Sequence, residues 1–203
     1  YKTASKEAKK STILNSKDFT RAKETIKFIK DKKWNSALKS ASKIKDREFK
    51  NLITWMYLKT TRNGASFSEY KNFIEQNSEY PRINRIRFLA EGKIYLRNNS
   101  PTSIINWFDK NPPLGGLGKI KLAEAFLQQG KTTEVEKLVK DGWISAEIRK
   151  NDLGYYRAKF KKFLTSDDHL KRADYLAWEK KYWDLKRMLK YLPSDERALY
   201  NAR

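Results

Sequence analysis

The stretch AEAFLQQGKTTEVEKL, residues 123–138, shows most directly how this chain folds. Apolar residues three and four positions apart flank a central Gly130, which is the pattern of two amphipathic helices joined by a tight turn. Ile120, Ala123 and Leu127 share one face of the first helix. In the second helix, Thr133 and Glu136 have the spacing of a capping box. We therefore predict a helical hairpin here.

The same segment lacks only one glycine of the phosphate-binding pattern G-x-x-x-x-G-K-[ST]. A phosphate loop needs a strand before its glycine-rich turn. Here Ala125 replaces the first glycine and a predicted helix precedes the turn, so we interpret residues 130–132 (GKT) as the hairpin turn. A second glycine-rich stretch, NPPLGGLGK at residues 111–119, also lacks the pattern and is interpreted as a rigid linker or hinge. We expect no cofactor.

Helical periodicity extends along nearly the whole chain, and no segment alternates as a strand would. Expected helix starts are Ser66 with its capping partner Glu69, and first helical turns containing Pro81 and Pro101. Expected helix ends are the glycines at 64, 130 and 142. Further helix faces are Phe19, Ala22, Ile26 and Ile29, and Phe49, Leu52, Ile53 and Met56.

A weak internal repeat relates three stretches: FIKDKKWNSALKSASKI (28–44), FLQQGKTTEVEKLV (126–139) and AWEKKYWDLKRMLKYL (177–192). Each reads as a helix, a polar turn and a second helix. Because such units cannot bury their apolar faces alone, they stack on one another. We predict one all-α domain over residues 1–203, a TPR-like α-solenoid or superhelix of stacked hairpins, with a compact bundle as the alternative.

The composition is strongly basic, with a net charge of +21 over 203 residues. This charge indicates either an anionic partner or general surface chemistry, since the lysines are scattered along the chain. No apolar run approaches the roughly 18 residues of a membrane span. The absence of cysteine excludes disulfides and thiolate metal sites.

No residue is predicted to be catalytic, cofactor-binding or metal-ligating. The single histidine, His169, follows Asp167 and Asp168 at an expected helix start, where carboxylates complement the helix dipole. A lone histidine is a poor basis for a metal site, which recruits several ligands. The tryptophans are expected to pack in the core, although aromatic rings can also stack on sugars or bases; they are Trp34, Trp55, Trp107, Trp143, Trp178 and Trp183.

Several stretches, taken in order over roughly residues 34–203, resemble the N-terminal helical domain of soluble lytic murein transglycosylases of the alphaproteobacterial type. The stretches are residues 55–91, 104–130 and 163–179. Their matching residues are Trp55, Gly64, Ala65, Phe67, Phe73, Pro81 and Arg85; then Trp107, Phe108, Pro112, Pro113, Leu114, Gly116, Gly118, Leu122, Ala123, Glu124 and Gly130; then Asp168, His169, Arg172, Asp174, Leu176 and Trp178.

The resemblance implies a curved α-superhelix that forms part of a ring around peptidoglycan glycan strands in the bacterial periplasm. Other cell-wall enzymes are further implied partners. In the family, a separate lysozyme-like domain cleaves the bond between N-acetylmuramic acid and N-acetylglucosamine and leaves a 1,6-anhydro end. A single Glu there acts first as acid and then as base.

The catalytic signature of that family is missing, because no Glu is followed by Ser and Gly-Leu-Met-Gln does not occur. We expect this chain to be the non-catalytic helical part of a longer enzyme, cut before its catalytic domain. The alternative is a TPR-like scaffold that binds a protein partner. A nucleic-acid-binding repeat depends on charge alone, and we do not expect nucleic acid as the partner.

Overall fold

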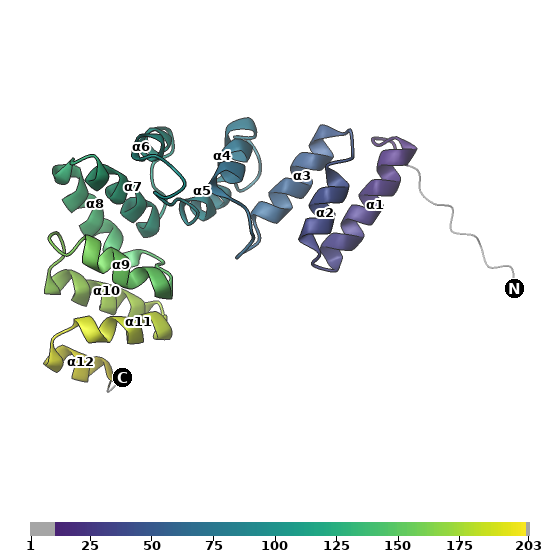
Figure 1. Ribbon diagram of the computed structural model, residues 1–203. Coiled ribbons are helices and arrows are strands. Elements are labelled where there is room, and N and C mark those ends of the chain that lie inside the picture. The colour runs from purple at the N-terminus through teal and green to yellow at the C-terminus, as the bar shows by residue number, and fades with distance from the viewer. Residues whose placement is uncertain (1–10, 202–203) are drawn as a thin grey trace, which may run out of the picture. The chain divides into compact units, whose positions relative to one another are not determined.

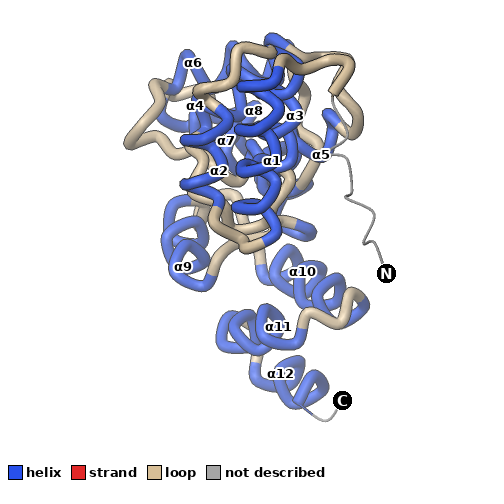
Figure 2. The backbone as a smooth tube through the Cα atoms, turned by 90° about the vertical axis from the view of Figure 1, so that its right-hand side faces the viewer, coloured by secondary structure: helices blue, strands red, loops and turns tan. Residues whose placement is uncertain are grey.

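The protein is all-helical in the computed structural model, which describes the backbone of residues 11–201. Within that range the chain forms α-helices α1 to α12 and one short 3-10 helix, η1, and no strand (Figures 1 and 2). The all-α prediction is thus confirmed. By its internal contacts the chain divides into two compact units, one up to Ser78 and one from Glu79.

Residues 11–78, the described part of the first unit, contain four helices, and side-chain caps set the starts of three of them. Asn15 and Asp46 accept hydrogen bonds from the first turns of α1 and α3, and Ser66 with Glu69 forms the predicted capping box of α4. Ile53 and Tyr70 are among its fully buried side chains. The helices are α1 (Ser16–Lys30), α2 (Trp34–Ala41), α3 (Arg47–Leu58) and α4 (Phe67–Gln76).

The second unit contains the remaining helices, among which α7 packs against α8, α8 against α10, and α10 against α11 (Figure 1). One apolar cluster of this unit contains Trp143 and Phe160, both with no exposed surface. The elements are α5 (Ile83–Glu91), α6 (Pro101–Lys110), α7 (Gly116–Gln128), α8 (Thr132–Ser145), α9 (Lys150–Lys159), α10 (Ser166–Trp178), α11 (Tyr182–Met188), η1 (Leu189–Tyr191) and α12 (Ser194–Asn201).

One turn geometry recurs in the three stretches of the sequence repeat. The residue after each helix cap is left-handed, with φ of 58° at Lys32, 75° at Gly130 and 55° at Lys180. In each case the next amide reaches back to a carbonyl of the preceding helix, in the pattern of a Schellman motif. These bonds are Lys33 N–H to Phe28 O at 2.8 Å, Lys131 to Phe126 at 3.0 Å and Lys181 to Leu176 at 2.8 Å. The predicted hairpin turn at residues 130–132 is confirmed.

Four predicted helix boundaries are wrong. Gly142 lies inside α8, Thr133 follows the first residue of that helix and so cannot cap it, and Pro81 precedes α5. Gly64 lies beyond the end of α3, where its amide donates to the Tyr57 hydroxyl at 3.0 Å. The local sequence signals for helix starts and ends were wrong at these positions, because tertiary packing can override local preference.

Gly142 is instead part of a close contact between α7 and α8. A Cβ at Gly116 would lie 2.5 Å from both the Gly142 carbonyl oxygen and the Ala146 nitrogen. A Cβ at Gly142 would lie 2.8 Å from the Gly116 oxygen. The two backbones therefore touch directly, and only glycine fits at either position.

We expect Gly116→Ala to lower the free energy of unfolding by about 2–3 kcal/mol, because the added methyl group forces the two helices apart. Gly154→Ala is the matched control, since that glycine lies in α9 and a methyl group added to it would have no atom within 4 Å. There, alanine should raise the free energy of unfolding by about 0.5–1 kcal/mol. Urea titrations followed by circular dichroism measure both; equal effects of the two substitutions would contradict the packing role.

Candidate functional site

An exposed aromatic group lies where α10 turns into α11. Trp178 is 85% exposed, Tyr182 60% and Trp183 67%. The rings of Tyr182 and Trp183 meet edge to face, with centroids 5.1 Å apart. We call these residues the aromatic cluster. The core position predicted for Trp178 and Trp183 is wrong, whereas Trp107 and Trp143 are buried.

The aromatic cluster lies on both sides of the turn at Lys180. This residue has a left-handed conformation between the end of α10 at Trp178 and the start of α11 at Tyr182. A groove of about 970 Å³ adjoins the cluster between α10, α11 and α12. Its lining includes Trp178, Tyr182, Leu185, Lys186, Leu189 and Tyr200.

The polar groups at this groove are ordered by contacts within the chain. The Tyr200 hydroxyl donates to Asp174, and Arg187 pairs with Asp184. The Lys186 ammonium lies 5.9 Å from the Tyr182 ring centroid and 5.7 Å from that of Trp183. Exposed aromatic faces bordered by charged groups can stack on sugar rings or receive an apolar helix face.

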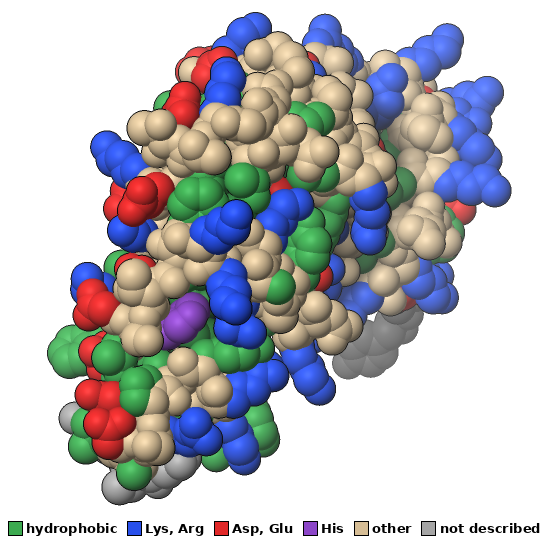
Figure 3. Space-filling model, turned by 60° about the vertical axis from the view of Figure 1, so that its left-hand side comes forward, with side chains coloured by type: hydrophobic (Ala, Val, Ile, Leu, Met, Phe, Trp, Pro, Cys, Tyr) green, Lys and Arg blue, Asp and Glu red, His purple; other side chains and the backbone are tan. Residues whose placement is uncertain are grey.

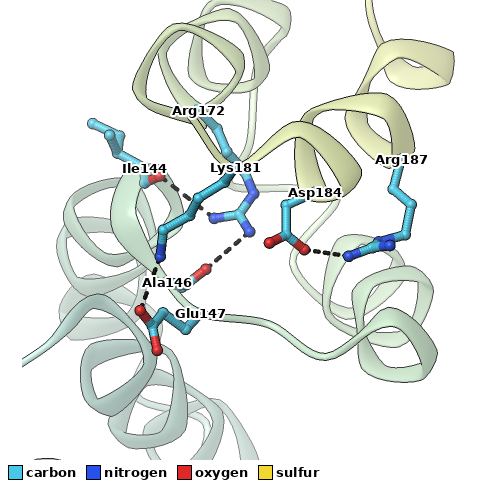
Figure 4. Close-up of polar contacts among 7 residues, drawn as sticks. All are labelled: Ile144, Ala146, Glu147, Arg172, Lys181, Asp184 and Arg187. Carbon is cyan, nitrogen blue, oxygen red and sulfur yellow. Dashed lines mark hydrogen bonds and ion pairs between the residues drawn. The ribbon is translucent and has the colours of Figure 1, made fainter. Parts of the chain in front are cut away.

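Arg172 connects α10 to the end of α8 (Figure 4). Its guanidinium donates to the carbonyl oxygens of Trp143, Ile144 and Ala146, the last at 2.9 Å. These carbonyls end a helix and would otherwise lack donors. Because the side chain is only 2% exposed, its charge serves this connection rather than an external ligand.

A second cavity, of about 250 Å³, lies among α5, α7 and α9. Lys121, which lines it, is 2% exposed, and its ammonium lies 3.8 Å from the Tyr95 ring centroid and 5.2 Å from that of Tyr156. Burial lowers the pKa of Lys121 to about 8, against the opposing effects of Glu124 and Asp152. We call this space the Lys121 cavity.

Glu91 borders the Lys121 cavity and caps the glycine-rich segment before α7. Its carboxylate oxygens accept from the Leu114 amide at 2.5 Å and the Gly115 amide at 3.1 Å. Its side chain fills the space that a Cβ at Gly118 would need. Burial raises the pKa of Glu91 to about 7, although these amides favour the ionised form. The predicted linker is therefore a helix start that is held by a buried acid.

Glu124 is also held within the second unit. Its carboxylate accepts hydrogen bonds from the Tyr155 hydroxyl at 2.5 Å and from Lys159 Nζ at 3.0 Å. Since Glu124 is 3% exposed, it joins α7 to α9 and does not face solvent.

His169 has a structural contact within the second unit. Its Nδ1 accepts from Trp143 Nε1 at 3.1 Å, and burial together with Arg157 lowers the pKa of His169. Figure 3 shows this histidine, in purple, beside hydrophobic side chains. Asp168 forms a capping box with Thr165, and Asp167 pairs with Lys171 at 2.7 Å. Residues 11–200 hold no group of three metal-ligating side chains.

Sequence reasoning missed both Glu91 and Lys121. Each is a charged residue between apolar neighbours, in RFLAEGK and in GKIKLAEAF. That pattern signals a buried charge, but only the fold brings α5 and α9 to α7.

The lysines and arginines are spread over the face drawn in Figure 3, in keeping with their scatter along the sequence.

No protein-family model, curated protein or solved structure matches the chain. No helix within the described residues is long and apolar enough to cross a membrane.

We expect the free energy of unfolding to fall as the pH rises from about 4.5 to 7, by on the order of 3 kcal/mol from Glu91 alone. The raised pKa of Glu91 means that the folded chain keeps a proton that the unfolded chain loses in this window. Glu91→Gln should remove this part of the pH dependence. It should also destabilise the fold by about 1–3 kcal/mol, because one buried amide loses its acceptor.

Urea titrations at pH 5, 6, 7 and 8 measure both effects. Glu134→Gln, an exposed substitution in α8, is the control and should keep the pH dependence of the unmodified chain. A Glu91→Gln variant with an unchanged pH slope would contradict the assignment of this proton to Glu91.

Proposed function

We propose that this chain is a non-catalytic helical domain of a peptidoglycan lytic transglycosylase that acts in the bacterial periplasm. Its hairpins would belong to a TPR-like α-superhelix that positions glycan strands or other cell-wall enzymes. Cleavage of the bond between N-acetylmuramic acid and N-acetylglucosamine, without hydrolysis, would be the work of another domain of the full enzyme.

One observation carries this proposal: three buried residues among those that resemble the family have scaffold roles in the second unit. Gly116 permits the contact of α7 with α8, and Arg172 binds the end of α8. Glu124 is bonded to Tyr155 and Lys159. Buried residues with such roles support a likeness of fold, and they leave catalysis to other parts of the enzyme.

The aromatic cluster is the surface best suited to glycan. Sugar rings carry apolar C–H faces that stack on tryptophan and tyrosine, while their hydroxyls need nearby polar groups. Trp178, Tyr182 and Trp183 offer such faces, and Lys186 lies beside two of them. The basic surface would add attraction to anionic wall polymers.

We expect the purified chain to sediment with peptidoglycan sacculi and to release no 1,6-anhydro-muropeptides. Trp178→Ala combined with Trp183→Ala should weaken sacculus binding about tenfold, because two exposed stacking surfaces are lost. Co-sedimentation quantified by gel densitometry gives the affinity, and chromatography of the supernatant detects released muropeptides.

Two controls separate stacking from charge. Leu52→Ala removes an exposed apolar residue of the first unit and should leave binding unchanged. Poly-γ-glutamate tests whether the net charge of +21 alone explains retention. Complete competition by this polymer, or release of anhydro-muropeptides by the chain itself, would count against the proposal.

A protein-binding scaffold is the second candidate function, and the apolar lining of the α10 to α12 groove favours it. An amphipathic helix of a partner could place its apolar face there. In that case the Trp178 and Trp183 substitutions would abolish co-purification with one partner and leave sacculus binding intact.

A further inference from the structure

The Lys121 cavity contains a buried charge without a polar partner. Among the described residues, no hydrogen bond or ion pair involves the Lys121 ammonium, whose contacts are the rings of Tyr95 and Tyr156. The nearest comparison is Lys159, which is bonded to Glu124 and Tyr155. An ammonium has three donors, and a buried one is costly to leave unpaired. The side chain is therefore arranged to meet an acceptor inside the cavity.

The opposite charge is offered by Asp152 on the same cavity wall. This half-buried carboxylate has no hydrogen bond or ion pair to another side chain in the part of the chain that the structure describes. The other acids of the cavity are engaged: Glu91 accepts two amides, and Glu147 pairs with Lys181 at 2.9 Å (Figure 4). Within residues 11–200, Lys121 and Asp152 thus remain as a cation and an anion of this cavity that are not paired with each other or with another side chain.

Arg149 adds to the positive side, because it precedes α9, lines the cavity and provides no side-chain cap. Asp152 lies in the first turn of α9, where a carboxylate complements the helix dipole. The cavity therefore combines groups that attract a carboxylate with a separate carboxylate that attracts an ammonium.

We propose that the Lys121 cavity binds a small zwitterion of the α-amino acid type, with its carboxylate at Lys121 and its ammonium at Asp152. The volume of about 250 Å³ lies below the roughly 300–1,000 Å³ of sites for drug-sized ligands, which suits a molecule of this size. Tyr95 and Tyr156 provide apolar walls for the side chain of the ligand. This assignment does not depend on the proposed function.

The first experiment is an NMR titration of the unmodified chain with three kinds of probe. L-alanine and D-alanine carry both charges, propionate carries only the carboxylate, and ethylamine carries only the ammonium. At least one alanine should shift the signals of Tyr95, Lys121 and Asp152 and bind about tenfold more tightly than either single-charge probe. If neither alanine binds, or if propionate binds equally well, the proposal is overturned.

Variants then test the two charges separately. Lys121→Met keeps the length of the side chain without its charge, and Asp152→Asn keeps the shape; each should weaken alanine binding about tenfold. Lys137→Met, an exposed substitution in α8, is the control and should bind as the unmodified chain does. Unchanged binding by folded Lys121→Met would overturn the proposal. If that variant does not fold, Asp152→Asn and the three kinds of probe still decide whether the cavity binds a zwitterion. Sacculus binding is a separate measurement that tests only the proposed function.

Discussion

The backbone contact between Gly116 and Gly142 is the constraint on which the second unit depends. It sets how closely α7 approaches α8, and therefore where the apolar side chains of Ile120 and Trp143 meet. At the start of α7, the buried carboxylate of Glu91 accepts hydrogen bonds from the Leu114 and Gly115 amides. The Lys121 cavity lies beside this capped helix start.

Polar side chains connect the later helices of the second unit to the end of α8. Arg172 satisfies the carbonyls at the end of α8 and so fixes α10 against it, while Lys181 pairs with Glu147 just beyond that helix end. Each of these groups is a long side chain that reaches from one hairpin to the previous one. The exposed aromatic cluster follows directly, because it is carried by the turn that Lys181 completes.

The sequence predicted helix content, the turn at Gly130 and the capping box at Ser66 well, because these features depend on residues close together in the chain. It failed at Gly142 and at Trp178, for a different physical reason in each case. Gly142 is required inside α8 because the backbone of α7 lies against it, and a tryptophan at helical spacing is buried only if another element covers it. Neither condition can be read from local spacing, and the same is true of the placement of Lys121 and Asp152 at one cavity.

The left-handed turns of this chain have a consequence for its tolerance of mutation. Lysine or arginine occupies that conformation at Lys32, Arg62, Arg82 and Lys180, where glycine would be less strained by about 1–2 kcal/mol. The turns are therefore imposed by the helices on either side of them and are not selected by their own residues. Sequence drift in the turns would change stability while leaving the hairpin geometry intact, whereas drift at Gly116 or Gly142 would alter the architecture itself.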